Sequence, residues 1–224
     1  MANIRATDQP NSKTKVLIRA LQFLKIRKQD NQDKSSLNDI FIAVMGPTGA
    51  GKSSFINAVT GRTDAVVGHG LESCTKDMEE FKMVMPLELA NKYPGLCSKN
   101  IVLVDTPGFD NSHLDDSEIL QRMVLWLKSR RTQGVTISGI IYIQESTRTN
   151  LKDLKQLLNI DYHRFVLVTT CDKVPPQEEA SREQTRMELW EEFIKNGAAM
   201  FPASAHRQIL EHIISLACQP CIEP

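Results

Sequence analysis

A glycine-rich segment at residues 46–53, Gly-Pro-Thr-Gly-Ala-Gly-Lys-Ser, carries the residue types needed to bind a polyphosphate. It has the spacing GxxxxGK[S/T], follows a short apolar run and precedes a helical pattern. Glycines allow consecutive backbone N–H groups to wrap around phosphate oxygens where a Cβ atom would clash. The start of the helix adds the positive end of its dipole. We therefore expect a phosphate-binding loop (P-loop) here.

Two side chains at the end of this loop have separate expected roles. Lys52 would place its ammonium group on the β- and γ-phosphates, and the Ser53 hydroxyl would ligate Mg²⁺. The expected ligand contacts of the loop are Gly46, Thr48, Gly49, Ala50, Gly51, Lys52, Ser53 and Ser54. A glycine-rich turn that merely precedes a helix is the alternative interpretation.

A second motif, Asp105-Thr106-Pro107-Gly108, follows the apolar run 101–104. A strand that ends at Asp105 would carry its carboxylate toward the phosphates, where it can hold a Mg²⁺-bound water. The backbone N–H of Gly108 can then approach the γ-phosphate. Alone, this tetrapeptide is also compatible with an ordinary turn. Combined with the P-loop, it predicts a Mg²⁺ site at Ser53 and Asp105.

Apolar runs that alternate with amphipathic segments predict the elements that position these motifs. We expect strands at 40–45, 80–87, 101–104, 138–143, 165–169 and near 199, and helices at 52–60, 116–131, 150–158, 178–196 and 204–216. Strand 80–87 alternates in the manner of an edge strand. The other strands read as buried, which predicts an α/β domain with a mostly parallel sheet and helices on both faces. Ligands of such sheets bind at the carboxyl ends of the strands, where the motifs fall.

Gly-x-x-Gly-Ala-Gly-Lys-Ser-Ser followed by Asp-Thr-Pro-Gly-Phe resembles the septin, Toc and immunity-associated (AIG-type) branch of P-loop GTPases. The segments VGHGLESCTKD (67–77), VDTPGFD (104–110), SGIIYI (138–143) and VLVTTCDKV (166–174) are closest to small G-domain proteins predicted from fungal genomes. The resemblance spans residues 38 to 217 and implies a three-layer, Ras-like G domain with a six-stranded sheet. It also implies GTP and GDP as ligands, with Mg²⁺.

The resemblance assigns two further motifs. Ser73-Cys74-Thr75 would be the first switch, in which Thr75 ligates Mg²⁺ when GTP is bound; an ordinary loop threonine is the alternative. GTPases usually show [NT]-Lys-x-Asp after the fifth strand, whereas this chain has Thr169-Thr170-Cys171-Asp172. Asp172 can accept hydrogen bonds from guanine N1–H and the 2-amino group, which adenine cannot offer in the same way.

Two parts of the expected base site match the usual GTPase motifs less well. Thr170 replaces the lysine that normally runs alongside the base, which would weaken affinity. Ser204 and Ala205 occupy the place where a fifth motif would offer a backbone N–H to the guanine oxygen, and they could equally form a helix N-cap.

The hydrolysis machinery is less complete than the binding machinery. Many GTPases place a water-orienting glutamine directly after the glycine of the second motif, but here that residue is Phe109. We therefore expect slow intrinsic hydrolysis, with Lys52, Thr75 and Gly108 as the catalytic residues. Members of the resembled branch commonly dimerise across the nucleotide face. Arg148 is a candidate to act in trans, and a solvated loop arginine is the alternative.

The composition bounds the other functional classes. Lys plus Arg and Asp plus Glu are equal at 27 each among 224 residues, which gives no indication of a nucleic-acid partner. Five irregularly spaced cysteines, no signal-peptide pattern and no bilayer-length apolar run predict a cytoplasmic protein.

We expect an N-terminal extension and linker at 1–36, a G domain at 37–217 and a tail at 218–224. Residues 1–34 carry eight basic and three acidic side chains. Within them, the partly amphipathic segment 13–28 could touch an anionic membrane or pack on the domain, and membrane contact is not expected.

The sequence thus predicts a Mg²⁺-dependent, self-associating GTPase switch. A non-hydrolysing GTP/GDP-binding scaffold, favoured by Phe109, and an adenine-nucleotide ATPase, favoured by Thr170, are the alternatives.

Overall fold

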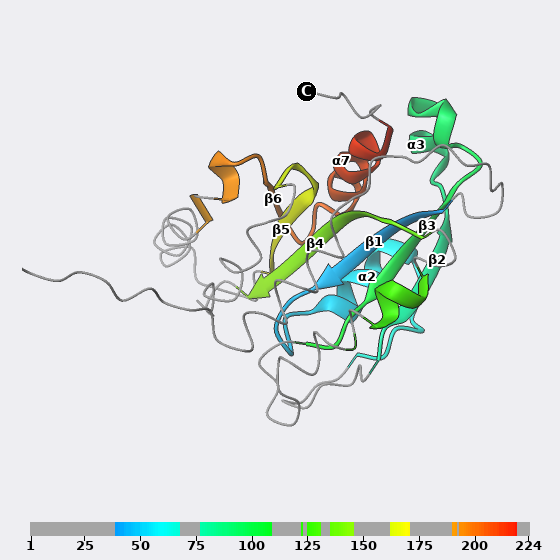
Figure 1. Ribbon diagram of the computed structural model, residues 1–224. Coiled ribbons are helices and arrows are strands. Elements are labelled where there is room, and N and C mark those ends of the chain that lie inside the picture. The colour runs from blue at the N-terminus through cyan, green and yellow to red at the C-terminus, as the bar shows by residue number, and fades with distance from the viewer. Residues whose placement is uncertain are drawn as a thin grey trace, which may run out of the picture.

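The computed structural model of the chain describes residues 39–67, 77–108, 122, 125–130, 135–145, 162–170, 190–191 and 193–218. Figure 1 shows a central sheet with α7 beside one of its faces and α3 at the upper end. Within the described ranges, no helix combines the length and the apolar character required to cross a membrane.

Six strands form one sheet in the order β2-β3-β1-β4-β5-β6 (Figure 1). Their bounds are β1 Ile40–Met45, β2 Glu79–Val84, β3 Asn100–Asp105, β4 Ile137–Glu145, β5 Phe165–Thr170 and β6 Ala199–Pro202. β2 pairs antiparallel with β3 at one edge, and every other pair is parallel. The mostly parallel sheet with its second strand at an edge confirms the predicted architecture.

Both faces of the sheet are buried, because alternate side chains of each strand enter different apolar clusters. On β1, Ile42 belongs to the cluster formed with α2 and α7. Its neighbours Phe41 and Ala43 belong to the opposite cluster, which contains Trp190 and Phe193. The two clusters make the sheet the middle of three layers, as predicted.

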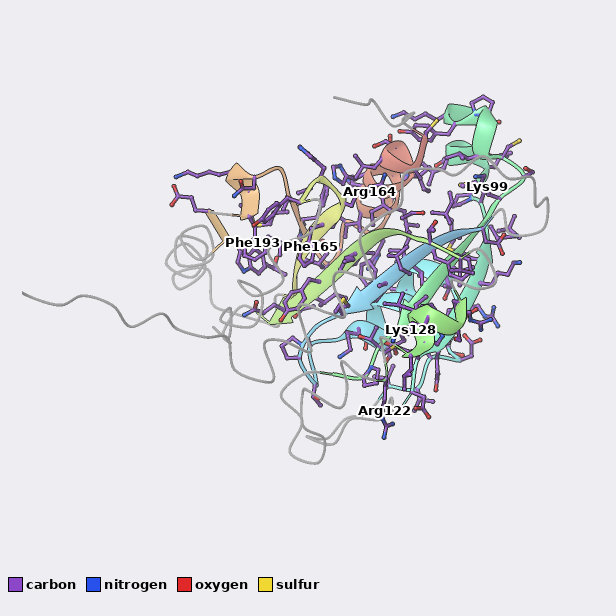
Figure 2. The ribbon with its side chains drawn as sticks, viewed as in Figure 1. Lys99, Arg122, Lys128, Arg164, Phe165 and Phe193 are labelled. Carbon is purple, nitrogen blue, oxygen red and sulfur yellow. The ribbon has the colours of Figure 1, made fainter. Side chains whose placement is uncertain are left out.

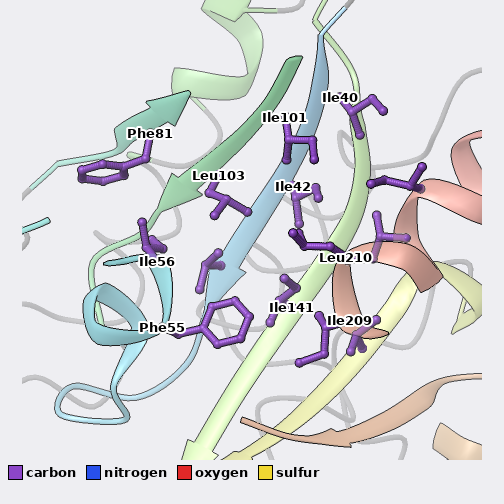
Figure 3. Packing of buried hydrophobic residues seen from close by; sticks show 14 of the residues in the cluster. Ile40, Ile42, Phe55, Ile56, Phe81, Ile101, Leu103, Ile141, Ile209 and Leu210 are labelled. Carbon is purple, nitrogen blue, oxygen red and sulfur yellow. The ribbon is translucent and has the colours of Figure 1, made fainter. Parts of the chain in front are cut away.

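The two clusters are built from close side-chain contacts. In Figure 3, Phe55 and Ile56 of α2 and Leu210 of α7 are directed at the strands. On the other face, Phe165 of β5 and Phe193 lie near one another (Figure 2), with their ring centroids 6.0 Å apart. Full burial of one such side chain stabilises the fold by about 1.5–3 kcal/mol.

Helix α2 spans Lys52–Thr60, as predicted, and ends at Gly61, whose φ of 67° is left-handed. Two of the other predicted helices are only partly described. Residues 122 and 125–130 are helical within predicted helix 116–131, and 190–191 and 193–195 are helical within 178–196. Predicted helix 150–158 lies outside the described residues.

The prediction of a strand over 80–87 is wrong at its C-terminal end. β2 stops at Val84, and Leu87–Lys92 form a short helix, α3, followed by the 3₁₀ turn η1 at Pro94–Leu96. Pro86 has no N–H for a ladder and stands at the N-cap of α3. Only Leu89 of this helix is buried, so the helix does not bury an apolar stripe. Ion pairs tie it to α7 instead: Glu88 with Arg207, and Lys92 with Glu211.

Helix α7 spans His206–Cys218, so the predicted start at Ser204 is also wrong. Ala203 N–H donates to Thr169 C=O at 2.8 Å, and Ala205 N–H donates to Pro202 C=O at 2.9 Å. These bonds hold 203–205 in a turn beside β5. The Ala205 C=O accepts the first helical bond, from Ile209, so Ser204 is not the N-cap.

Helix α7 lies so close to β4 that a methyl group would not fit between them. A Cβ atom built on Gly139 would stand 2.7 Å from Cγ2 and 3.2 Å from Cγ1 of Ile213, which is fully buried. We predict that Gly139→Ala lowers the free energy of unfolding by about 1–3 kcal/mol, because the branched Ile213 side chain must leave its rotamer or the helix must shift. Urea denaturation measures the change.

The matched control is Gly95→Ala in η1, where an added Cβ meets nothing within 4 Å. We expect this control to change the free energy of unfolding by less than about 0.5 kcal/mol. Equal urea midpoints for the two variants would contradict the claim that the α7–β4 contact leaves no room for a Cβ atom at position 139.

Candidate nucleotide-binding site

The P-loop connects the end of β1 to the start of α2 through three glycines in backbone conformations that other residues rarely adopt. Gly46, Gly49 and Gly51 have φ angles of 146°, 77° and 89°. At Gly46 the constraint is also steric, because a Cβ atom there would lie 2.0 Å from the backbone oxygen of Ile143 in β4. The loop therefore passes against the neighbouring strand and turns back toward the N-terminus of α2.

Lys52, the first residue of α2, is folded into this loop. Its Nζ donates to the backbone oxygens of Gly46 and Pro47 at 3.1 and 2.9 Å, and the side chain is 7% exposed. Burial lowers the pKa of Lys52 to about 8, although the nearby Asp105 carboxylate acts in the opposite direction. The loop thus encloses a positive charge that is poorly hydrated, which favours an incoming anion.

Ser53 and Asp105 come together from different elements at the carboxyl end of the sheet. Asp105 ends β3 and pairs in register with Val44 of β1, so it stands beside the start of the P-loop. The Ser53 hydroxyl donates to Asp105 Oδ2 at 2.7 Å, and Asp105 is 1% exposed. A hydroxyl and a carboxylate next to a phosphate loop are oxygen donors of the kind Mg²⁺ takes. The residues present therefore fit a Mg²⁺ ion.

The segment after Asp105 is anchored to β1 and to the P-loop. The Thr106 hydroxyl donates to the backbone oxygen of Val44 at 2.9 Å, and Thr106 is fully buried. A Cβ atom on Gly108 would lie 2.5–2.6 Å from atoms of Thr48. Gly108 is therefore packed on the P-loop, where its backbone can approach a ligand. The sequence assigns no role to Thr106, although its position directly after a buried strand indicates a place at the site.

The two described parts of the expected base site lie close to the same loop. Thr170 ends β5, and its Cγ2 would lie 3.6 Å from a Cβ placed on Gly51. The turn containing Ser204 and Ala205 is bonded to the preceding residue, Thr169. The structure therefore brings both segments to the P-loop end of the sheet.

Other predicted site residues lie outside the described part of the chain. They are Thr75 of the first switch, Asp172 of the fourth motif, Phe109 after the second motif, and Arg148. Ser54, which we expected among the ligand contacts, is exposed on α2. Ala50 is buried, with 4% of its surface exposed.

The buried charge of Lys52 gives opposite effects on stability and on binding. Its pKa is 10.5 in the unfolded chain and about 8 in the fold, so the unfolded state binds the proton more tightly. Below pH 8 the charge destabilises the ligand-free fold, and this effect disappears as the pH rises from 8 to 10.5. We predict that Lys52→Met raises ligand-free stability at pH 7 by about 1–3 kcal/mol and abolishes polyphosphate binding.

Denaturation of both proteins in urea between pH 7 and 10.5 measures this effect, with nucleotide titration alongside. The difference in free energy of unfolding between the variant and the wild type should become smaller as the pH rises. A Lys52→Met protein that is less stable than wild type at pH 7 would contradict the argument from burial.

Solved structures of known proteins share this fold. A structure described by the statement that dimerization is important for the GTPase activity of the chloroplast translocon components atToc33 and psToc159 has a TM-score of 0.57 and 16% identity, and covers 94% of this chain and 92% of that chain. Toc33 from Arabidopsis thaliana in complex with Mg²⁺ and GMPPNP has a TM-score of 0.52 and 16% identity, with 93% and 95% coverage.

A third structure is Era in complex with MgGDPNP and nucleotides 1506–1542 of 16S ribosomal RNA. Its TM-score is 0.54 at 17% identity, and it covers 84% of this chain and 59% of that chain. At these identities the likeness shows a shared fold.

Sequence comparison identifies the family. No curated protein sequence matches the chain. The profile of the family described as 50S ribosome-binding GTPase matches residues 41–184, which is more than half of the chain and includes the P-loop and Asp105–Gly108. With a P-loop that buries Lys52 beside the Ser53–Asp105 pair, the chain belongs to this family of P-loop GTPases.

Proposed function

We propose that this chain is a Mg²⁺-dependent GTP-binding protein that hydrolyses GTP slowly and acts as a nucleotide-controlled switch. The observation that carries the proposal is the hydrogen bond between Ser53 and Asp105 next to the buried ammonium of Lys52. A hydroxyl, a carboxylate and a cation converge there from β3 and α2. This is the set of groups that phosphoryl transfer requires around a γ-phosphate.

Each of these residues has a defined task in the proposed reaction. Lys52 would exchange its two bonds to loop carbonyls for bonds to the β- and γ-phosphate oxygens. Ser53, Thr75 and Asp105 would hold Mg²⁺, the last through a water. When bound, the ion neutralises charge that develops between the β- and γ-phosphates. The Gly108 N–H would stabilise the γ-phosphate and connect its presence to the segment that follows.

The side chain after Gly108 limits the proposed rate. Phe109 cannot orient the attacking water, so the remaining contribution comes from positioning and charge. A protein of this kind spends long periods in its GTP-bound state unless a second group is supplied. The same residue favours the alternative of a scaffold that binds GTP or GDP without turnover.

Self-association is the proposed source of that second group. The similar fold of atToc33 and psToc159, for which dimerization is described as important for GTPase activity, supports a homodimer across the nucleotide face. Arg148 is our candidate for donation in trans. The likeness to Toc33 also supports placement in the septin, Toc and AIG-type branch. The sequences of the motif segments support a relationship with fungal G-domain proteins.

The rest of the proposal concerns organisation and partners. We assign residues 37–217 to the G domain, with an N-terminal extension and a short C-terminal tail, and we place the protein in the cytoplasm. Era is described in complex with ribosomal RNA. For this chain we propose GTP and GDP as ligands and no nucleic-acid partner, since equal numbers of acidic and basic residues give no indication of one.

The base specificity of this site is tested by calorimetric titration of nucleotide-stripped protein with GDP, GTPγS and ATPγS in Mg²⁺. We predict tight binding of both guanine nucleotides and binding of ATPγS at least about 100-fold weaker, because Asp172 would be left with unpaired acceptors by adenine. Asp172→Asn should abolish guanine binding or shift preference toward xanthine nucleotides. Equal binding of ATPγS, unaffected by this substitution, would favour the adenine-nucleotide alternative.

The role of self-association is tested by measuring GTP turnover per protomer over a hundredfold range of protein concentration. We predict that the specific rate rises with concentration, because a group donated in trans acts only in the dimer. Arg148→Ala should remove the rise while leaving guanine nucleotide affinity unchanged. A constant rate would argue against donation in trans, and the absence of any single-turnover hydrolysis would favour the scaffold.

A further inference from the structure

The turn 203–205 is held at both ends, and each end depends on a different element. At its start, the Ala203 N–H bonds the Thr169 oxygen of β5 at 2.8 Å. At its end, the Ala205 oxygen accepts the Ile209 N–H at 3.0 Å, which begins α7. The position of Ser204 is therefore set by β5 on one side and by the first turn of α7 on the other.

The first residue of α7, His206, contacts the helix that carries the phosphate-binding side chains. Its ring meets the ring of Phe55 edge-on, with centroids 5.3 Å apart and an interplanar angle of 62°. Phe55 is 3% exposed and lies two residues after Ser53, with its N–H bonded to the Gly51 oxygen at 2.8 Å. In Figure 3, Phe55 extends from α2 toward Ile209 of α7. An edge-to-face pair has a preferred geometry, so it restricts the orientation of both helices.

The surroundings of His206 favour its neutral form. Partial burial lowers its pKa below the ordinary value of 6.5. A positive charge at the N-terminus of α7 would also be unfavourable to the helix dipole. The next residue, Arg207, pairs at the surface with Glu88 of α3. Near neutral pH, His206 therefore acts as an uncharged aromatic ring between two helices.

We propose that His206 is a positioning residue for nucleotide-base recognition, which uses its contact with Phe55 to hold the turn 203–205 at a set distance from the P-loop. The turn already uses the Ala205 N–H for its bond to Pro202. The contact with the guanine oxygen thus falls to Ser204, whose position depends on the start of α7. This inference rests on the proposed guanine binding and adds a residue that no motif contains.

The test compares GDP and ADP affinities of His206→Ala, His206→Phe and wild type, by competition against a fluorescent GDP analogue in Mg²⁺. We expect His206→Ala to weaken GDP binding about three- to tenfold and to leave ADP binding within about twofold. His206→Phe retains an aromatic ring at this position, so it should restore the wild-type ratio of the two affinities. The control is Gln208→Ala. Gln208 is exposed on α7, two residues after His206, so this substitution should leave both affinities unchanged.

Three results would overturn the inference. The first is equal weakening of GDP and ADP binding by His206→Ala, which would indicate a general disturbance of the P-loop. The second is a GDP affinity that His206→Ala leaves unchanged. The third is a His206→Phe variant with the same affinities as His206→Ala. Thermal unfolding of each variant shows that the compared proteins are folded. A wild-type protein that binds ADP as well as GDP would instead overturn the proposed guanine specificity, and this inference with it.

Discussion

The enclosure of the Lys52 ammonium by its own backbone loop is the constraint on which the rest of the site depends. Lys52 is 7% exposed, and its charge is compensated by two carbonyl oxygens and the nearby Asp105. Such burial destabilises a folded protein unless a partner is present. The ligand-free fold is therefore organised around an anion that it does not itself provide, and binding of a polyphosphate would relieve the imbalance.

The loop that encloses this charge is closely packed against its neighbours. The P-loop crosses β4 at Gly46 without room for a side chain, and Gly108 packs on Thr48 with no more space. Ile42 and Val44 of β1, the strand that leads into the loop, are completely buried. Close packing of this kind fixes the course of the loop around the ammonium. The apolar layers are thus as necessary to the proposed chemistry as the polar residues themselves.

The P-loop, Asp105 and the six strands could be predicted from the sequence because their signals are local. Glycines at set spacing, a lysine at a helix start and a carboxylate after an apolar run each identify their own positions. Helix α3 gave no such signal. The alternation of Phe81, Met83, Met85 and Leu87 continues past the end of β2, although Leu87 is 75% exposed.

The start of α7 could not be predicted for a related reason. Ser204 is a good N-cap residue, but a bond from Ala203 to Thr169, 34 positions earlier, holds it in a turn. Ion pairs between α3 and α7, and the ring contact between His206 and Phe55, are likewise contacts between distant segments. Local propensity carries no information about such contacts. A strand or a loop motif can be predicted because its signal lies within its own residues.

The two ends of the P-loop would follow different courses in a lineage released from nucleotide binding. Gly46 is retained by selection for folding alone, because any side chain there collides with the backbone of β4. Lys52 has no such protection: its replacement by an apolar residue loses two bonds to loop carbonyls and removes a buried charge. Genetic drift would therefore erase the lysine before the glycine. A descendant that had become a pure scaffold would carry an intact glycine at 46 and an apolar residue at 52.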